Sequence, residues 1–154
     1  MAEILVVDDD DLIRDTLYEL LSPDYFCKTA ETAEQALARL EAESFDVVLT
    51  DISMPGLSGL ELLGHVLQKY PKTPVIIISG ISDQEHAQRL IKLGAFDYLL
   101  KPFRLETVEK SVKRAVEYRR KVLLNLDGMP NRSETDVARE DDHTDWESLK
   151  APQS

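Results

Sequence analysis

The chain has 154 residues, a formal net charge of -11, 43% hydrophobic residues and 31% charged residues. This composition is typical of one globular domain with or without a tail, and the acidic balance argues against nonspecific binding to nucleic acid or anionic lipid. The single cysteine, Cys27, excludes an internal disulfide and fits a reducing compartment. Because no apolar segment approaches the roughly 20 residues of a membrane span, we expect a cytoplasmic protein without a membrane segment.

Short apolar runs alternate with segments of helical periodicity in the first part of the chain. The runs predict strands at Ile4–Val7, Tyr25–Thr29, Val47–Thr50, Val75–Ile78 and Tyr98–Leu100. Apolar residues between and after these runs recur at spacings of three and four, as on one face of a helix, and predict five helices. Cys27 falls within the second strand, which predicts a buried thiol rather than a nucleophile.

Start and stop signals support the predicted helices. Three pairs have the spacing of a capping box, namely Thr32 with Gln35, Ser58 with Glu61, and Ser82 with Glu85. Gly94 follows the fourth helical pattern and is expected to end that helix, because glycine readily adopts the backbone conformation that closes a helix.

The alternation of strands and helices predicts an α/β fold with a parallel sheet covered on both faces. At this length we expect a doubly wound, flavodoxin-like (βα)5 domain over residues 1–124, with strand order 2-1-3-4-5. Its ligand crevice is expected at the carboxyl ends of strands one and three. Residues 125–154 have no sustained periodicity and more acidic than basic residues, which predicts a disordered natural tail or the start of a linker.

Four consecutive aspartates, residues 8–11, directly follow the first strand. Like charges about 4 Å apart repel by roughly 4 kcal/mol at an effective dielectric constant of 20, so water, a helix N-terminus or a cation must relieve them. We expect Asp10 or Asp11 to cap the next helix. Asp8 and Asp9 then remain as candidate cation ligands.

Polar residues also stand at the ends of three other strands, namely Asp51, Ser79 and Lys101. Each has an ordinary explanation as a turn or solvated residue, but in this fold all three converge on one crevice with Asp8 and Asp9. Mg²⁺ prefers such oxygen ligands. The ammonium and hydroxyl groups suit a phosphoryl group, toward which an ionised Asp51 is a candidate nucleophile.

The segments "ILVVDDDDLIRD", "DVVLTDISMPGLSGLELL", "TPVIIISG" and "GAFDYLLKPF" resemble the receiver domains of two-component response regulators. The resemblance covers roughly residues 2–124. It implies that Asp51 accepts a phosphoryl group from the phosphohistidine of a sensor histidine kinase or a phosphotransfer protein. Such a domain is a signalling phosphoacceptor with self-catalysed transfer and dephosphorylation, and is not an enzyme.

The resemblance also implies a ligand set for Mg²⁺. Asp9 and Asp51 would bind the ion directly together with the backbone carbonyl of Ser53, while Asp8 would act largely through water. Lys101 would pair with the phosphate, and the Lys101–Pro102 peptide is expected to be cis.

Two further residues match the family's switch positions, Ser79 as the hydroxyl and Tyr98 as the aromatic. We expect Ser79 to turn toward a phosphate oxygen and Tyr98 to move into the space that opens beneath the fourth helix. The face made by the fourth helix, fifth strand and fifth helix would then change shape toward a partner or a second copy, forming a homodimer. The alternative is that Tyr98 is a half-buried strand residue without a switching role.

Three other functions fit less well. A haloacid-dehalogenase-like phosphatase also begins with a strand ending in Asp-x-Asp, but Gly-Thr should follow, and its second acidic pair is found only as Asp141 and Asp142 in the tail. A flavodoxin would need a first loop that attracts phosphate, which four carboxylates repel. A receiver-like module that no longer takes phosphate should lack an essential group, and none is missing.

The last predicted helix is rich in lysine and arginine, including Lys110, Lys113 and Arg114. We interpret these cations as compensating the helix dipole rather than binding nucleic acid, because no aromatic platform accompanies them. His65, His86 and His143 are far apart in sequence, and we expect them to be exposed and without a catalytic or metal-binding role.

Overall fold

The computed structural model describes residues 1–54, 56–80 and 84–125, in which strands and helices alternate along the chain. The elements are β1 (Glu3–Val7), α1 (Asp11–Leu21), β2 (Phe26–Ala30), α2 (Ala33–Ala42), β3 (Val47–Asp51), α3 (Gly59–Lys69), β4 (Val75–Ser79), α4 (Gln84–Leu93), β5 (Asp97–Leu100) and α5 (Leu105–Leu124). The predicted tail and the predicted helix start at Ser82 lie outside the described residues.

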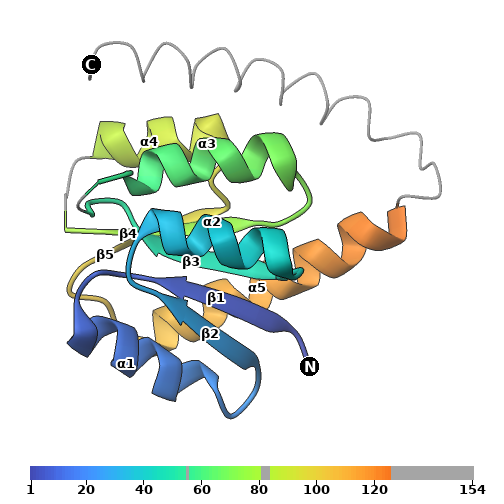
Figure 1. The fold of residues 1–154 in the computed structure, drawn as a ribbon, viewed down its shortest axis with the longest axis horizontal. Coiled ribbons are helices and arrows are strands. Elements are labelled where there is room, and N and C mark those ends of the chain that lie inside the picture. The colour runs from blue at the N-terminus through green and yellow to red at the C-terminus, as the bar shows by residue number, and fades with distance from the viewer. Residues whose placement is uncertain (55, 81–83, 126–154) are drawn as a thin grey trace.

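All neighbouring strands pair in parallel, in the order β2-β1-β3-β4-β5. Helices α1 and α5 cover one face of the sheet, and α2, α3 and α4 cover the other (Figure 1). The predicted flavodoxin-like fold and strand order are therefore confirmed. None of the helices in the described ranges is both long and apolar enough to cross a membrane.

The sheet lies between two apolar layers. Successive side chains along a central strand pack into one layer and then into the other. Leu5 and Val7 of β1 pack with the layer beneath α2, α3 and α4, while Ile4 and Val6 pack with the layer beneath α1 and α5. All four side chains are at most 1% exposed. The continuous apolar run thus reflects a central parallel strand with both faces covered.

Strand β2 differs from its prediction by one residue and by its burial. It runs Phe26–Ala30 rather than Tyr25–Thr29, and it lies at the edge of the sheet with β1 as its partner. Cys27 is consequently half-buried rather than buried, although burial still raises the pKa of its thiol. The prediction of a buried thiol was wrong because it followed the apolar run Tyr25–Cys27 and not the edge position that the predicted strand order already gave to this strand.

The helix ends confirm most of the expected signals. Ser58 and Glu61 form a reciprocal capping box at the start of α3. The Thr32 hydroxyl accepts from the Gln35 N–H, whereas the Gln35 side chain accepts from the Glu31 N–H, so this second pair forms only half of the expected box. Gly94 has φ of +126° directly after α4, as expected for a helix stop.

Candidate functional site

The candidate site is the carboxyl edge of the sheet, where the strand ends bring together five of the predicted residues. Asp8 and Asp9 follow β1, Asp51 ends β3, Ser79 ends β4 and Lys101 follows β5. These strands are neighbours in the sheet, so residues up to 93 positions apart in the sequence meet at one edge.

Lys101 bridges the two buried carboxylates. Its Nζ lies 3.3 Å from Oδ2 of Asp51 and 3.5 Å from Oδ2 of Asp8. The Lys101 backbone N–H donates to the Ser79 carbonyl at 2.8 Å, and the following peptide, Lys101–Pro102, is cis as predicted. The end of β5 therefore fixes the ammonium group over the ends of β1 and β3.

One lysine does not neutralise two buried carboxylates. Asp8 is 1% exposed and Asp51 is 5% exposed. Burial raises the pKa of Asp8, and the Asp51 charge adds to this effect while the Asp10 N–H and Lys101 oppose it. Burial likewise raises the pKa of Asp51 against the opposing effect of Lys101. The charged form of each carboxylate thus carries an electrostatic cost, which a further cation would reduce.

The arrangement of the acids suits a hard divalent cation. One carboxylate oxygen from each of Asp8, Asp9 and Asp51 lies within 4.8 Å of the others. Oδ2 of Asp8 is buried and has no hydrogen-bond partner among the described residues, although Lys101 approaches it as an ion pair. An incompletely satisfied buried oxygen beside two further carboxylates fits Mg²⁺, which uses one or two protein carboxylates together with water and phosphate oxygens.

The four aspartates divide as the sequence suggested. Asp10 caps α1, with its Oδ1 accepting from the backbone N–H groups of Leu12 and Ile13 at 2.9 and 3.3 Å. Asp11 is the first residue of the helix, so Asp10 is the cap. Asp8 and Asp9 remain directed to the cluster with Asp51, Asp8 buried and Asp9 exposed.

Serine residues and a glycine flank Asp51. The Ser53 backbone N–H lies 3.4 Å from Oδ1 of Asp51, which brings the Ser53 backbone beside the carboxylate cluster. Ser79 is fully buried at the end of the neighbouring strand. A Cβ atom placed on Gly80 would meet nothing within 4 Å, so the space beside this residue is open.

Tyr98 lies on β5, half-buried, and faces α4 rather than the carboxylates. Its ring contacts His86 of α4 edge to face, with ring centroids 6.1 Å apart. His86 is half-buried with a buried Nε2 atom, so the expectation that it is exposed was wrong, whereas His65 is exposed. The helical pattern of α4 did not show that His86 lies on the side facing β5. His143 lies outside the described residues.

Sequence reasoning missed Arg14, a residue of α1 that contacts the backbone of Asp8 at the site. Its Nη1 donates to the backbone carbonyl of Asp8 at 2.8 Å, and its Nη2 pairs with Asp11. The spacing of three residues between Asp11 and Arg14 predicts an ordinary helix-surface ion pair. No sequence signal predicts the contact with a strand-end carbonyl.

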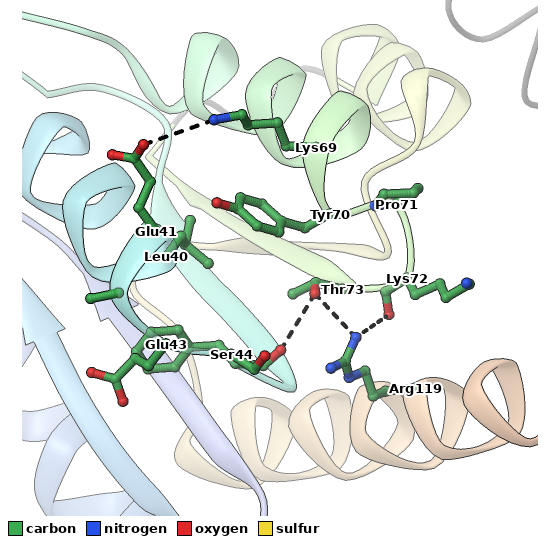
Figure 2. Close-up of a pocket in the computed structure, with 12 residues that line it drawn as sticks. Leu40, Glu41, Glu43, Ser44, Lys69, Tyr70, Pro71, Lys72, Thr73 and Arg119 are labelled. Atoms are coloured by element: carbon green, nitrogen blue, oxygen red, sulfur yellow. Dashed lines mark hydrogen bonds and ion pairs between the residues drawn. The ribbon is translucent and has the colours of Figure 1, made fainter.

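A hollow lies at the opposite edge of the sheet, between the ends of α2 and α3 and the second half of α5 (Figure 2). Arg119 donates there to the Lys72 carbonyl and to the Thr73 hydroxyl, and Lys69 pairs with Glu41. These polar groups are already partnered within the fold, which distinguishes this hollow from the carboxylate cluster.

The sequence profile of the response regulator receiver domain matches residues 4–113, which include every candidate residue named above at the carboxyl edge. The chain belongs to this family. Receiver domains are signalling phosphoacceptors that interact with histidine kinases or phosphotransfer proteins and generally bind Mg²⁺ at an aspartate cluster. The match decides against the phosphatase and flavodoxin alternatives.

Curated relatives of this receiver domain are regulators of greater length. It is 41% identical over 116 residues to the DNA-binding transcriptional regulator NtrC of Salmonella typhimurium, covering 75% of this chain and 25% of that protein. It is 35% identical over 123 residues to the C4-dicarboxylate transport transcriptional regulatory protein DctD of Rhizobium meliloti, covering 79% of this chain and 27% of that protein. The chain thus spans about a quarter of the length of these relatives.

Solved structures agree with this assignment. The receiver domain of NtrX from Brucella abortus is 38% identical with a TM-score of 0.70, and the match covers 74% of this chain and 98% of that chain. A response regulator receiver domain protein from Clostridium thermocellum is 34% identical with a TM-score of 0.73, covering 80% of this chain and 99% of that chain. The described fold is therefore that of a receiver domain.

Proposed function

We propose that Asp51 accepts a phosphoryl group from a phosphohistidine of a sensor histidine kinase or phosphotransfer protein in the cytoplasm. The observation that carries this proposal is the placement of Asp51, which ends β3 beside Asp8 and Asp9 and lies 3.3 Å from the Lys101 ammonium. A carboxylate suited to act as a nucleophile thus lies beside a cation and further carboxylate oxygens at the carboxyl edge of the sheet, which supports the proposal.

In the forward reaction an oxygen of the ionised Asp51 attacks phosphorus, and a new O–P bond forms as the P–N bond to the donor histidine breaks. The electron pair of the broken bond leaves with the histidine nitrogen. Lys101 pairs with a phosphoryl oxygen, and the Ser79 hydroxyl donates to another.

Asp8, Asp9, Asp51 and the Ser53 carbonyl would hold Mg²⁺, which when bound neutralises charge on the phosphoryl oxygens. In the hydrolysis that resets the domain, a water oxygen attacks phosphorus and the O–P bond to Asp51 breaks. The carboxylate is regenerated, and inorganic phosphate leaves with the two hydrogens of the water. The same side chains would hold the acyl phosphate during hydrolysis, so we expect the domain to catalyse its own dephosphorylation.

The direct test is incubation of the full chain with acetyl phosphate and Mg²⁺, followed by intact-mass measurement. The wild type should gain one phosphoryl group, and Asp51→Asn should gain none. Asp46→Asn is the matched control, because Asp46 also lies beside a strand of the same sheet but pairs with Arg119 at the opposite edge. An adduct that persists in Asp51→Asn, or is lost equally in Asp46→Asn, would refute the assignment of Asp51.

We further propose that phosphorylation changes the face formed by α4, β5 and α5. Ser79 would turn toward the phosphoryl group, and Tyr98 would then move inward past His86, with which it is in edge-to-face contact. The changed face would bind an output partner or a second copy of the chain. In the same experiment Tyr98→Ala should still be phosphorylated but should lose the phosphate-dependent change in dimerisation, whereas unchanged dimerisation would show that Tyr98 is only a strand residue.

A further inference from the structure

Arg14 is a nearly buried arginine in an exposed, acidic part of the molecule. Its side chain is 12% exposed, whereas those of its two ionic partners, Asp11 and Glu31, are 79% and 58% exposed. Exposed ion pairs of this kind contribute little to stability. The contact that distinguishes Arg14 is therefore the hydrogen bond from Nη1 to the Asp8 carbonyl, at 2.8 Å.

The Asp8 carbonyl needs this donor because the strand ladder ends one residue earlier. Val7 is the last residue of β1 in register with both neighbours, opposite Ala30 of β2 and Thr50 of β3. The Asp8 N–H still donates to the Ala30 carbonyl, but among the described residues no backbone N–H donates to the Asp8 carbonyl. A side chain from α1 thus replaces the missing strand partner.

This carbonyl belongs to the peptide that joins Asp8 to Asp9. The peptide unit is planar, so fixing its oxygen fixes the plane and the directions in which both Cα atoms leave it. Asp8 is further held by the Asp10 N–H, which donates to its Oδ1 at 2.9 Å, but the Asp9 side chain is exposed. The direction of Asp9 toward the cluster therefore depends on the orientation of this peptide.

We propose that Arg14 is a positioning residue for the divalent cation, holding the Asp8–Asp9 peptide so that both carboxylates converge with Asp51. The inference rests on the proposed function, in which these carboxylates bind Mg²⁺. In this role Arg14 touches neither the ion nor the phosphoryl group. It orients the groups that do.

Electrostatics and positioning predict opposite effects when Arg14 is removed. Arg14 is a cation close to the cluster, so loss of its charge alone would strengthen the binding of another cation. Loss of the hydrogen bond would instead release the Asp8–Asp9 peptide and weaken binding. Residues that orient metal ligands typically change affinity by about 10- to 100-fold when mutated. The direction of the change therefore separates the two roles.

The test is isothermal titration calorimetry of the full chain with Mg²⁺. Unfolding by urea is measured in parallel. Arg14→Gln should bind Mg²⁺ about 10-fold more weakly than the wild type. Arg39→Gln is the matched control, because Arg39 donates from α2 to another strand carbonyl, that of Thr29, at 2.7 Å. It should lose a comparable hydrogen bond yet bind Mg²⁺ as the wild type does.

Arg14→Lys keeps the positive charge but not the forked guanidinium, and is the second variant if Arg14→Gln does not fold. It too should bind Mg²⁺ more weakly. Binding by the folded Arg14 variants that equals or exceeds that of the wild type would overturn the positioning role and leave the proposed function intact. A wild type that binds no Mg²⁺ and forms no adduct with acetyl phosphate would overturn the proposed function, and this inference with it.

Discussion

The two edges of the sheet each hold a carboxylate beside a cation, with different results. At the amino edge, Asp46 accepts from the Glu3 N–H at 2.8 Å and from Nε of Arg119 at 3.2 Å. The same guanidinium donates to the Lys72 carbonyl and the Thr73 hydroxyl, both at 3.3 Å (Figure 2). Each carboxylate oxygen has a donor, and one arginine ties α5 to the starts of β3 and β4.

At the carboxyl edge the balance is reversed. Lys101 faces both Asp8 and Asp51, at 3.5 and 3.3 Å, and Oδ2 of Asp8 lacks a hydrogen bond among the described residues. Burial raises the pKa of both acids. The amino edge therefore stabilises the fold, while the carboxyl edge retains uncompensated negative charge that a divalent cation can satisfy.

The position of Asp51 at the carboxyl edge depends on the backbone at the end of β3, and Gly59 of α3 lies directly against that backbone. A Cβ atom on Gly59 would lie 2.2 Å from the Asp51 carbonyl oxygen and 2.6 Å from Cα of Ile52. Because both contacts are with backbone, Gly59→Ala should destabilise the domain by about 3 kcal/mol or more. Urea unfolding followed by circular dichroism measures this loss.

Gly80→Ala is the matched control at the end of the neighbouring strand, where an added Cβ meets nothing within 4 Å. Its effect should stay within about 0.5 kcal/mol. Equal destabilisation by the two substitutions would mean that the close approach of α3 to β3 is not what holds Asp51 in place.

The same chemical change at the two edges should have opposite effects on stability. Asp46→Asn removes the ion pair with Arg119 and turns an amide N–H toward one of the two donors that Asp46 accepts from. It should lower the free energy of unfolding by about 1 kcal/mol. Asp51→Asn removes a buried charge that repels Asp8, and should raise the free energy of unfolding measured without Mg²⁺ at neutral pH. Urea titrations of both variants against the wild type give the two signs.

A loss of stability in Asp51→Asn would contradict the view that the carboxyl edge is electrostatically unbalanced. It would mean that the ion pair with Lys101 outweighs the repulsion between the acids. Both variants should keep the native far-ultraviolet circular dichroism spectrum, so the comparison concerns stability alone.

The smallest predicted effect is the dependence of that difference on pH. Burial raises the pKa of Asp51 above 3.8, so the folded state holds the proton more tightly than the unfolded chain. The stabilisation from Asp51 is complete below the unfolded pKa and is lost as pH rises through the folded pKa. The stability advantage of Asp51→Asn should therefore be near zero in acid and should grow toward neutral pH.

Unfolding of the wild type and Asp51→Asn in urea at several pH values, without divalent cations, measures this trend. If the difference in unfolding free energy between Asp51→Asn and the wild type were constant across pH, folding would not raise the pKa of Asp51, and this prediction would be wrong.

Much of the fold and the candidate site could be predicted from the sequence because it depends on local patterns and one topological rule. Apolar runs separated by helical periodicity indicated the parallel sheet, and the residue after each run indicated what stands at the strand ends. In a parallel sheet these ends share one edge, so Asp8, Asp51 and Lys101 could be placed together without coordinates. A cap at Asp10 or Asp11 followed from their position before the first helical pattern, and the structure selected Asp10.

Tertiary structure alone decided the contacts between groups that share no local pattern. The half-burial of Cys27 depends on how far the packed helices cover the edge strand β2. Asp46 and Arg119 are 73 residues apart, and Arg14 bonds a carbonyl whose lack of a strand partner appears only once the ladder is formed. Side-chain periodicity records which face of an element is apolar, whereas a single long polar side chain finds its partner only when the packed elements bring that partner within reach.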